Sequence, residues 1–339
     1  METQVLKPNA ESLIFAGELL KNGELVGIPT ETVYGLAANA LNGKAVEKIF
    51  KAKGRPMDNP LIVHICDISQ VDSLVTEFSE KAKALAKHFW PGALTIIMPC
   101  SQNVPTQVTA GLSTVAVRFP SHKTAQDIIR ASGVPLAAPS ANLSGSPSPT
   151  NAQYVYNDMN GKIPLIIDGG ESNVGVESTV ITLATEVPTL LRPGGITVEE
   201  LEAVIGKINI DKGVTEMLEH NAVVASPGMK YKHYAPKANI VMLKGSQAEY
   251  IKYINNNSKE NTGALCYTGD KEYLNVPCVV LGDEKDYIAQ AHNLFTALRT
   301  LDEMGLKTVY ARCPDTEGVG LAVYNRLIRS AGFEVIDLA

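Results

Sequence analysis

Cysteine is scarce and scattered in this chain. The five cysteines are Cys66, Cys100, Cys266, Cys278 and Cys313, and no two of them form a C-x-x-C pair. An odd number of isolated cysteines argues against a disulfide framework and against a zinc site built on thiolates. The pattern is typical of reduced thiols in a cytoplasmic protein, and we expect that location.

Long apolar runs and an excess of positive charge are also absent. No apolar run approaches the roughly 20 residues that span a bilayer, and the opening METQVLKPNAES has no signal-peptide core. The 36 acidic residues outnumber the 30 basic ones, giving a net charge of −6. We therefore expect no membrane association and no broad nucleic-acid surface, although these totals allow a local basic pocket.

Several catalytic signatures are missing too. The chain has no G-x-x-x-x-G-K-[ST] loop, no G-x-S-x-G frame, and no cluster of His, Cys and Asp with metal-ligand spacing. These absences disfavour a P-loop ATPase, a hydrolase with a nucleophilic serine, and a metal centre held by protein ligands.

What is present predicts two domains. A chain of 339 residues is long for one domain, and 45% hydrophobic with 19% charged residues is ordinary for a globular protein. Helices are predicted over 11–23 and before Trp90. Strand-like runs lie at 25–30, 61–65, 93–99, 114–120, 135–140, 164–170 and 178–183. Because strands outnumber helices, we predict a mixed sheet.

The pattern changes after residue 197. Residues 206–236 show little periodicity and are predicted to be a linker. Beyond it, apolar helical faces at 288–301 and 321–328 accompany further strand-like runs. These runs lie at 240–244, 264–269, 278–283, 308–312 and 334–338. The alternation predicts a small, open, parallel α/β domain.

The first polar motif beside a strand is PTETVYGLAANA (29–40). We predict that a helix follows, because Thr30 or Thr32 could cap one. A helix amino end with such short polar groups suits a carboxylate or phosphate. Ordinary capping without a ligand is the simpler interpretation.

The second motif is KAKGRPMDNPLIVHI (51–65). Lys51, Lys53 and Arg55 crowd five positions, and His64 stands inside an apolar strand, where an imidazole needs a partner. A solvated charged loop and a core histidine are the alternatives without a binding role.

The third motif, PLAAPSANLSGSPSP (135–149), places Ser140 and Asn142 after an apolar strand. Ligands of open α/β sheets bind at carboxyl ends of strands, although a flexible loop is the alternative. Together with the cations of the second motif, these groups predict a nucleotide-handling pocket. Arg118 and Arg192 stand in apolar stretches. Each could point outward or into a pocket, and each taken alone is expected at the surface.

In this order, the motifs resemble the Sua5/YrdC family of L-threonylcarbamoyladenylate synthases. The matching segments are PTETVYGLAANA, KAKGRPMDNPLIVHI, WPGALTIIMP, TVAVRFP, APSANLSG, VGVESTVI and LLRPGG, over about residues 10–200. HYAP (233–236), followed by a second domain, resembles the longer Sua5 type.

The resemblance implies an α/β fold in three parts. A YrdC-like twisted mixed sheet with helices around an open cleft is expected over 1–205. A linker with KYKHYAP is expected over 206–238, and a smaller Rossmann-like parallel α/β domain over 239–339. The KYKHYAP stretch (230–236) is predicted to close over the pocket as a lid, with a solvated connector as the alternative.

The resemblance also implies a nucleotidyltransferase reaction and its site. Threonine, bicarbonate or CO2, and ATP give threonylcarbamoyl-AMP and pyrophosphate. Catalytic roles fall on Lys53, Arg55, Ser140 and Asn142. Threonine binding falls on Thr32, His64, Arg118, Ser178 and the backbone of Ala138. ATP binding falls on Arg55, Asn59, Thr114, Ser140, Ser148, Arg192 and Tyr231.

The implied partners follow from this reaction. Mg²⁺ is expected on the ATP phosphates and not on protein ligands. A separate transferase is expected to move the threonylcarbamoyl group to adenosine 37 of tRNAs reading ANN codons, so tRNA binding by this chain is not required. A carbamoyltransferase of the hydrogenase-maturation type is a rival, although it carries C-x-x-C pairs that are absent here. An RNA-binding module using the same cleft is the other.

Overall fold

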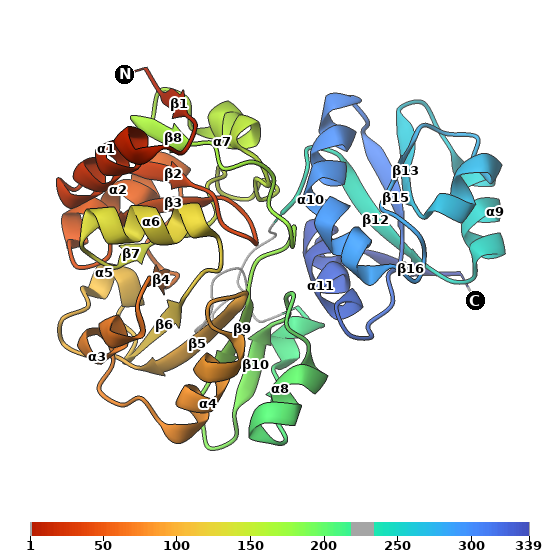
Figure 1. Ribbon diagram of the computed structural model, residues 1–339. Helices are drawn as coiled ribbons and strands as arrows, with labels where there is room; N and C mark the ends of the chain where they lie inside the picture. The colour runs from red at the N-terminus through yellow and green to blue at the C-terminus, as the bar shows by residue number, and fades with distance from the viewer. Residues whose placement is uncertain (1, 218–233, 339) are drawn as a thin grey trace. The chain divides into compact units, whose positions relative to one another are not determined.

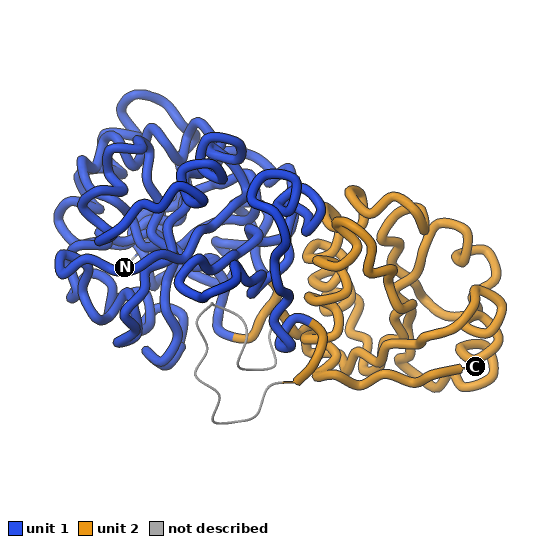
Figure 2. The backbone as a smooth tube through the Cα atoms, turned by 90° about the horizontal axis from the view of Figure 1, so that it is seen from below, with its two compact units in different colours: residues 1–144, 148–214, 218–230 blue, residues 145–147, 215–217, 231–339 orange. Residues whose placement is uncertain are grey.

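The computed structural model describes residues 2–217 and 234–338, which form two compact units. Within the described residues, the first unit comprises 2–144 and 148–214. The second comprises 234–338 together with Gly145–Pro147 and Thr215–Met217 (Figure 2). No helix in these described ranges is long and apolar enough to cross a membrane.

The first unit is built on one mixed sheet of eleven strands, in the order β1-β8-β2-β3-β7-β4-β6-β5-β9-β10-β11 (Figure 1). The strands are β1 (Gln4–Leu6), β2 (Val26–Ile28), β3 (Gly35–Asn39), β4 (Ile62–His64), β5 (Leu94–Pro99), β6 (Thr114–Arg118), β7 (Leu136–Ala137), β8 (Leu165–Ile167), β9 (Thr179–Thr182), β10 (Thr189–Arg192) and β11 (Asn209–Ile210). β4 pairs with β6 in parallel and β5 pairs with β6 antiparallel, so the predicted mixed sheet is confirmed.

Helices pack against this sheet. They are α1 (Ala10–Lys21), α2 (Gly43–Lys53), α3 (Val71–Leu74), α4 (Glu80–Phe89), α5 (Thr106–Thr109), α6 (Lys123–Ser132), α7 (Ala152–Met159) and α8 (Val198–Ile205), with 3-10 turns η1 (Ile68–Gln70) and η2 (Lys212–Val214). α1 and α6 lie side by side, and a Cβ at Gly17 would meet Ala131 at 2.6 Å. Apolar residues of α1, β2 and α6, such as Leu20, Ile28 and Ile129, are buried between these helices and the sheet. This close packing fixes the positions of the strands.

The prediction of a helix after the PTET motif is wrong, because strand β3 follows it. Residues 29–34 connect β2 to β3, and these strands pair antiparallel with Ile28 opposite Gly35. The run from Gly35 to Ala38 is fully buried, because β3 lies between β2 and β7 in the sheet. Tertiary pairing overrides the helical preference of this Leu- and Ala-rich segment.

Part of the predicted linker belongs to the first sheet. β11 pairs in parallel with β10, and η2 follows it directly. Residues 218–233 lie outside the described ranges. The predicted lid KYKHYAP falls mostly there, and so does Tyr231.

The second unit is a parallel α/β fold, as predicted. Its five strands follow the order β14-β13-β15-β12-β16, and every pair is parallel. The strands are β12 (Asn239–Lys244), β13 (Thr262–Cys266), β14 (Cys278–Val280), β15 (Thr308–Arg312) and β16 (Val335–Asp337). Its helices are α9 (Gln247–Asn257), α10 (Tyr287–Glu303) and α11 (Gly320–Ser330), with η3 (Thr268–Tyr273). α9 was not predicted, although Ser246 and Glu249 form a capping box that marks its start.

Candidate active site

Two neighbouring strands bring His64 and Arg118 together. β4 and β6 are parallel, and their register places His64 opposite Arg118 at the carboxyl ends of both strands. Arg118 is only 4% exposed and His64 only 3%. The expectation that Arg118 lies at the surface is therefore wrong, because β6 runs through the middle of the sheet between β4 and β5.

A carboxylate from the loop between β2 and β3 pairs with Arg118. The Nη2 atom of Arg118 lies 2.8 Å from Oε1 of Glu31, and its Nε donates to the carbonyl of Gly92 at 3.3 Å. Burial by itself would raise the pKa of Glu31, but the charge of Arg118, together with the N–H dipoles of Arg118 and of the neighbouring backbone, outweighs it and holds the pKa below its usual value. The site thus contains an ionised acid–base pair.

His64 is kept neutral by its surroundings. Burial, followed by the positive charge of Arg118, lowers the pKa of His64 to about 3. The Nδ1 atom lies 3.2 Å from the carbonyl oxygen of Ile62. The imidazole is therefore an uncharged hydrogen-bonding group at neutral pH.

This pKa predicts acid-sensitive stability. Below pH 6.5 the unfolded chain protonates this histidine while the folded chain does not, so stability is lost as pH falls from about 6.5 towards about 3. Between pH 7 and pH 5, His64 should remove about 2 kcal/mol of the free energy of unfolding. Urea titrations of the wild type and of His64→Gln at both pH values measure this loss.

The variant should lose less stability on acidification than the wild type does. His88→Gln is the matched control, because His88 is exposed on α4. Equal pH dependence in the wild type and His64→Gln would show that His64 is not buried as a neutral group.

The K-x-R and S-x-N motifs meet at Lys53. α2 begins at its cap Asn42 and ends at Gly54, whose φ of +63° suits glycine, and this places Lys53 in the last turn. Its Nζ atom donates to the carbonyls of Ser140 and Asn142, the latter at 2.6 Å, and lies 3.4 Å from Asn142 Oδ1. Burial, then the Arg55 charge, lowers the pKa of Lys53 to about 7. Lys53 therefore anchors the S-x-N loop.

Ser178 stands at the centre of a second buried cluster. Arg192 donates from Nε to the Ser178 carbonyl at 3.0 Å and from Nη2 to its hydroxyl at 3.1 Å. The Ser178 hydroxyl also shares a hydrogen bond with Thr95 at 2.8 Å. Arg192 is 6% exposed, so its expected surface position is wrong as well, because β10 is paired on both sides.

Other predicted residues lie in the loops around these strands. Thr32 is buried and its hydroxyl shares a hydrogen bond with Thr30 at 2.9 Å. Ala138 is buried beside Gly35, where a Cβ would meet its own at 3.2 Å. The hydroxyl of Ser148, which is fully buried, donates to Glu177.

The remaining ATP residues are less closely grouped. Asn59 is buried with an Oδ1 atom that accepts no hydrogen bond from the described residues, and Arg55 is half-buried just after α2. Thr114 begins β6 and Arg118 ends it, a separation of about 13 Å along the strand. The strand does not bring these two together, although an extended nucleotide could span that length.

Three participants were not assigned roles from the sequence. Glu31 pairs with Arg118, Glu177 accepts from Ser148, and Thr95 contacts Ser178. A buried arginine needs a counter-charge, but burial of Arg118 was not predicted. The adjacency of Glu31 to Thr32 and of Glu177 to Ser178 was the available signal.

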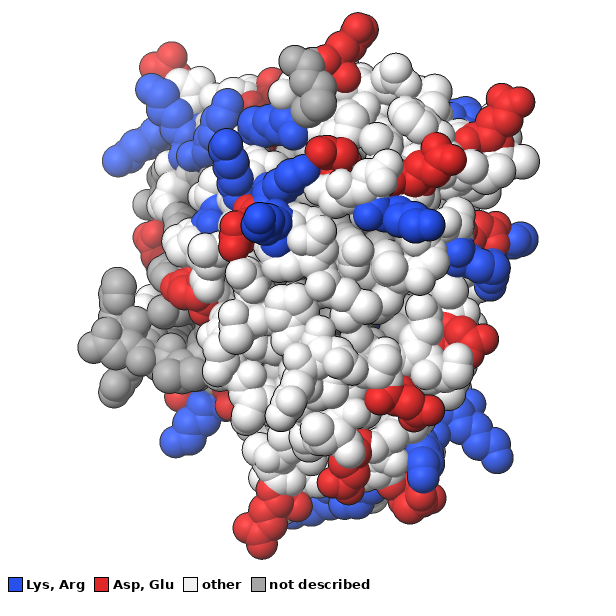
Figure 3. All heavy atoms as spheres, turned by 90° about the vertical axis from the view of Figure 1, so that its left-hand side faces the viewer, with Lys and Arg blue, Asp and Glu red and all other residues white. Residues whose placement is uncertain are grey.

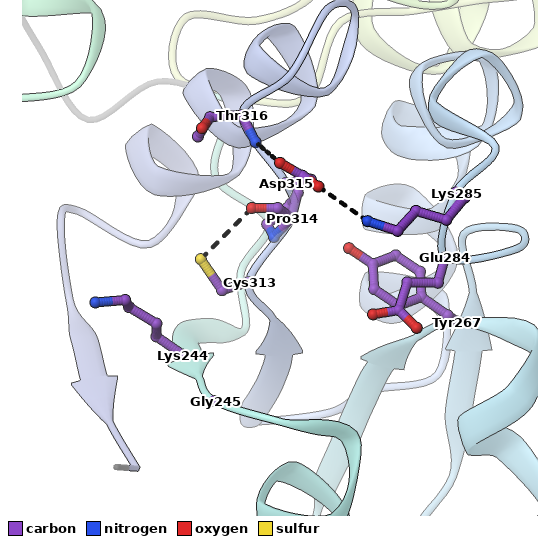
Figure 4. Close-up of a pocket in the computed structure, with 9 residues that line it drawn as sticks. All are labelled: Lys244, Gly245, Tyr267, Glu284, Lys285, Cys313, Pro314, Asp315 and Thr316. Carbon is purple, nitrogen blue, oxygen red and sulfur yellow. Dashed lines mark hydrogen bonds and ion pairs between the residues drawn. The ribbon is translucent and has the colours of Figure 1, made fainter.

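A cavity of about 340 Å³ lies in the second unit at the carboxyl ends of β12, β13 and β15 (Figure 4). Its charged side chains neutralise one another or nearby residues. Lys285 pairs with Asp315 at 3.1 Å, and Glu284 pairs with Arg312 at 2.7 Å. Lys244 pairs with Asp337 and is 65% exposed. Because these charges are already paired, the cavity is a weaker candidate for a ligand-binding site than the buried polar groups of the first unit.

Surface charge on one face bears on the RNA-binding alternative. In Figure 3, lysines and arginines gather near one end with acidic residues among them, and a broad middle area carries neither charge. A continuous basic track of the kind that binds a nucleic-acid backbone is not present on this face.

Comparisons with known proteins show which family the chain belongs to. A family model described as "Telomere recombination" (Sua5_yciO_yrdC) matches residues 18–194, and one described as "Threonylcarbamoyl-AMP synthase, C-terminal domain" matches 196–332. The chain belongs to the Sua5 family of threonylcarbamoyl-AMP synthases. The C-terminal match sets it apart from the carbamoyltransferase alternative.

Relatives in this family match almost end to end. The threonylcarbamoyl-AMP synthase of Bacillus subtilis is 48% identical, over 98% of this chain and 97% of its own length. That of Pyrococcus abyssi is 47% identical over 95% of each chain. The crystal structure of P. abyssi Sua5 complexed with L-threonine superposes with a TM-score of 0.92 at 43% identity, covering 99% of this chain and all of the other.

Proposed function

We propose that this chain converts L-threonine, bicarbonate or CO2, and ATP into threonylcarbamoyl-AMP and pyrophosphate. The observation that carries the proposal is the buried Arg118 among hydroxyl and imidazole groups at the carboxyl ends of β4 and β6. An arginine in such a place can hold an amino-acid carboxylate with two parallel hydrogen bonds. A family member of the same two-part fold is known with threonine bound.

The chemistry requires positioning more than covalent catalysis. The threonine ammonium first loses a proton, and the resulting amine attacks CO2, or attacks bicarbonate with loss of water, to form a carbamate. The carbamate oxygen then attacks the α-phosphorus of ATP and displaces pyrophosphate, so the amino acid and the nucleotide must be held in line. Arg118 would hold the carboxylate, while the neutral His64, Thr32 and Ser178 offer hydrogen bonds to the rest of threonine. The site need not supply a nucleophile.

The charged residues divide into two groups. Lys53 and Arg192 both donate to acceptors on the protein itself, Lys53 to carbonyls of the S-x-N loop and Arg192 to Ser178. We therefore assign them mainly to positioning those groups. Arg55 is half-buried directly after α2 and also interacts with other residues of the chain. We assign it to the ATP phosphates because of its place in the K-x-R motif.

Mg²⁺ would enter with ATP. Among the described residues no three His, Cys, Asp or Glu side chains gather into a metal site. We assign the ion to the phosphate oxygens of ATP, because Mg²⁺ prefers hard oxygen ligands. The ion would offset phosphate charge there. The product would be consumed by a transferase acting on adenosine 37 of tRNAs that read ANN codons, and this chain need not bind the tRNA itself.

The reaction is tested by measuring pyrophosphate release with substrates left out one at a time. Release should require ATP, threonine and bicarbonate together, and mass spectrometry should show threonylcarbamoyl-AMP. Serine should be several-fold poorer, because losing one methyl contact costs roughly 1 kcal/mol. Equal ATP turnover without threonine would refute the proposal, and salt-sensitive RNA binding without turnover would favour the RNA-binding alternative.

A further inference from the structure

The ion pair of Glu31 and Arg118 is the feature of the site that the proposed function leaves unexplained. A pocket built to take a substrate carboxylate needs an arginine, but this arginine already faces a carboxylate at 2.8 Å. Both side chains are buried, at 9% exposure for Glu31 and 4% for Arg118. A buried carboxylate beside an anion-binding arginine must have a role compatible with that anion.

The pair is incompletely satisfied. Within residues 2–217 and 234–338, no donor makes a hydrogen bond of good geometry to either carboxylate oxygen of Glu31. The Nη2 atom of Arg118 likewise contacts Glu31 as an ion pair without a well-formed hydrogen bond. Removing charged groups from water without replacing their hydrogen bonds is unfavourable. The arrangement is therefore that of a site awaiting a ligand with both donors and acceptors.

The two histidines near Glu31 do not supply it with a second positive charge. His64 is neutral, because burial and Arg118 lower its pKa to about 3. Burial also lowers the pKa of His122, although the Glu31 charge opposes that shift. Glu31 and Arg118 thus form a pair of nearly zero net charge, with one group suited to an anion and the other to a cation.

A zwitterionic α-amino acid has matching charges. Its carboxylate can accept from Arg118, and its ammonium group carries three N–H donors that suit a carboxylate without hydrogen bonds. A monoanion would be attracted by Arg118 but repelled by Glu31. We propose that Glu31 binds the ammonium group of the threonine substrate, so that the site selects a zwitterion over a plain carboxylate. This inference rests on the proposed function and adds the residue that recognises the amine.

The experiment compares two ligands that differ only by the amine. L-Threonine and 3-hydroxybutyrate are titrated calorimetrically into the wild type and into Glu31→Gln. The wild type should bind threonine at least tenfold more tightly. Glu31→Gln should weaken threonine binding by roughly ten- to a hundredfold, because a charge-assisted hydrogen bond is lost. Binding of 3-hydroxybutyrate should be unchanged or tighter, because the repelling charge is gone.

The matched control is Glu24→Gln. Glu24 is a half-exposed residue that pairs with Lys48 at 2.7 Å just before β2, at the other end of that strand from Glu31, and its removal should change neither affinity. Glu31→Asp, which keeps the charge on a shorter side chain, should retain part of the preference for threonine. If Glu31→Gln does not fold, the preference for threonine over 3-hydroxybutyrate in the wild type and in Glu31→Asp still tests whether the carboxylate binds the amine.

Two outcomes would overturn the inference. Equal weakening of both ligands in Glu31→Gln would mean that Glu31 only aligns Arg118. A wild type that does not prefer threonine to 3-hydroxybutyrate would exclude amine recognition altogether. Threonylcarbamoyl-AMP formation by the wild type is measured in parallel, so that failure of the amine-binding role and failure of the proposed function are told apart.

Discussion

Replacing Arg118 with alanine should lower kcat/KM for threonine by a hundredfold or more and should also destabilise the first unit. The loss of activity is expected because the substrate carboxylate loses its cation in a poorly solvated site. The loss of stability is expected because Glu31 would remain as a buried carboxylate without its partner, which costs about 3–5 kcal/mol. Pyrophosphate release and urea unfolding measure the two effects.

A double variant separates them. Arg118→Gln combined with Glu31→Gln removes both charges, so it should regain most of the lost stability while remaining inactive. Arg130→Ala is the control, because the Arg130 side chain is 61% exposed and pairs with Asp127 on its own helix, α6. Near-normal activity in either Arg118 variant would show that another group binds the carboxylate.

Replacing Lys53 with methionine should lower product formation by on the order of a hundredfold with little change in stability. The S-x-N loop would lose the donor that holds the carbonyls of Ser140 and Asn142, and misplacing a loop by about 1 Å can cost a factor of that size. Stability should change little because two effects offset each other. Burial disfavours the charged lysine, whose pKa falls to about 7, while methionine leaves two carbonyls without this partner.

The pH dependence provides a further check on Lys53. Its folded pKa lies below its unfolded pKa of 10.5, so between about pH 7 and 10.5 the unfolded chain binds more protons. The wild type should therefore gain stability relative to Lys53→Met as pH rises through this window. Lys51→Met, at an exposed position on the same helix, should match the activity of the wild type at each pH tested. A fully active Lys53→Met protein would contradict the anchoring role.

Local pattern predicted most elements of the two sheets. Alternating and continuous apolar runs placed β4, β5, β6 and β9 within one or two residues and β8 within three, and they indicated that the second unit is parallel. The physical reason is that burial of apolar side chains is the main force stabilising both sheets, and the spacing of apolar residues along the sequence shows which side chains are buried. The motif order likewise identified the family.

The environment of charged residues could not be read in the same way. An arginine in a short apolar run suits an edge strand or a central one, and only the strand order decides which. That order places β6 and β10 between neighbours, so Arg118 and Arg192 are buried. Each then requires a partner, and these partners come from distant segments at Glu31 and Ser178.

By itself, the sequence determined the family, the mixed and parallel sheets, and the kinds of side chain available for the chemistry. Tertiary structure alone decided that the segment after the PTET motif is a strand, and that Lys53 donates hydrogen bonds to the S-x-N loop. It also decided that Glu31 stands opposite Arg118. Such choices depend on contacts between residues far apart in the chain, where sheet pairing and the cost of burying charge outweigh local preference.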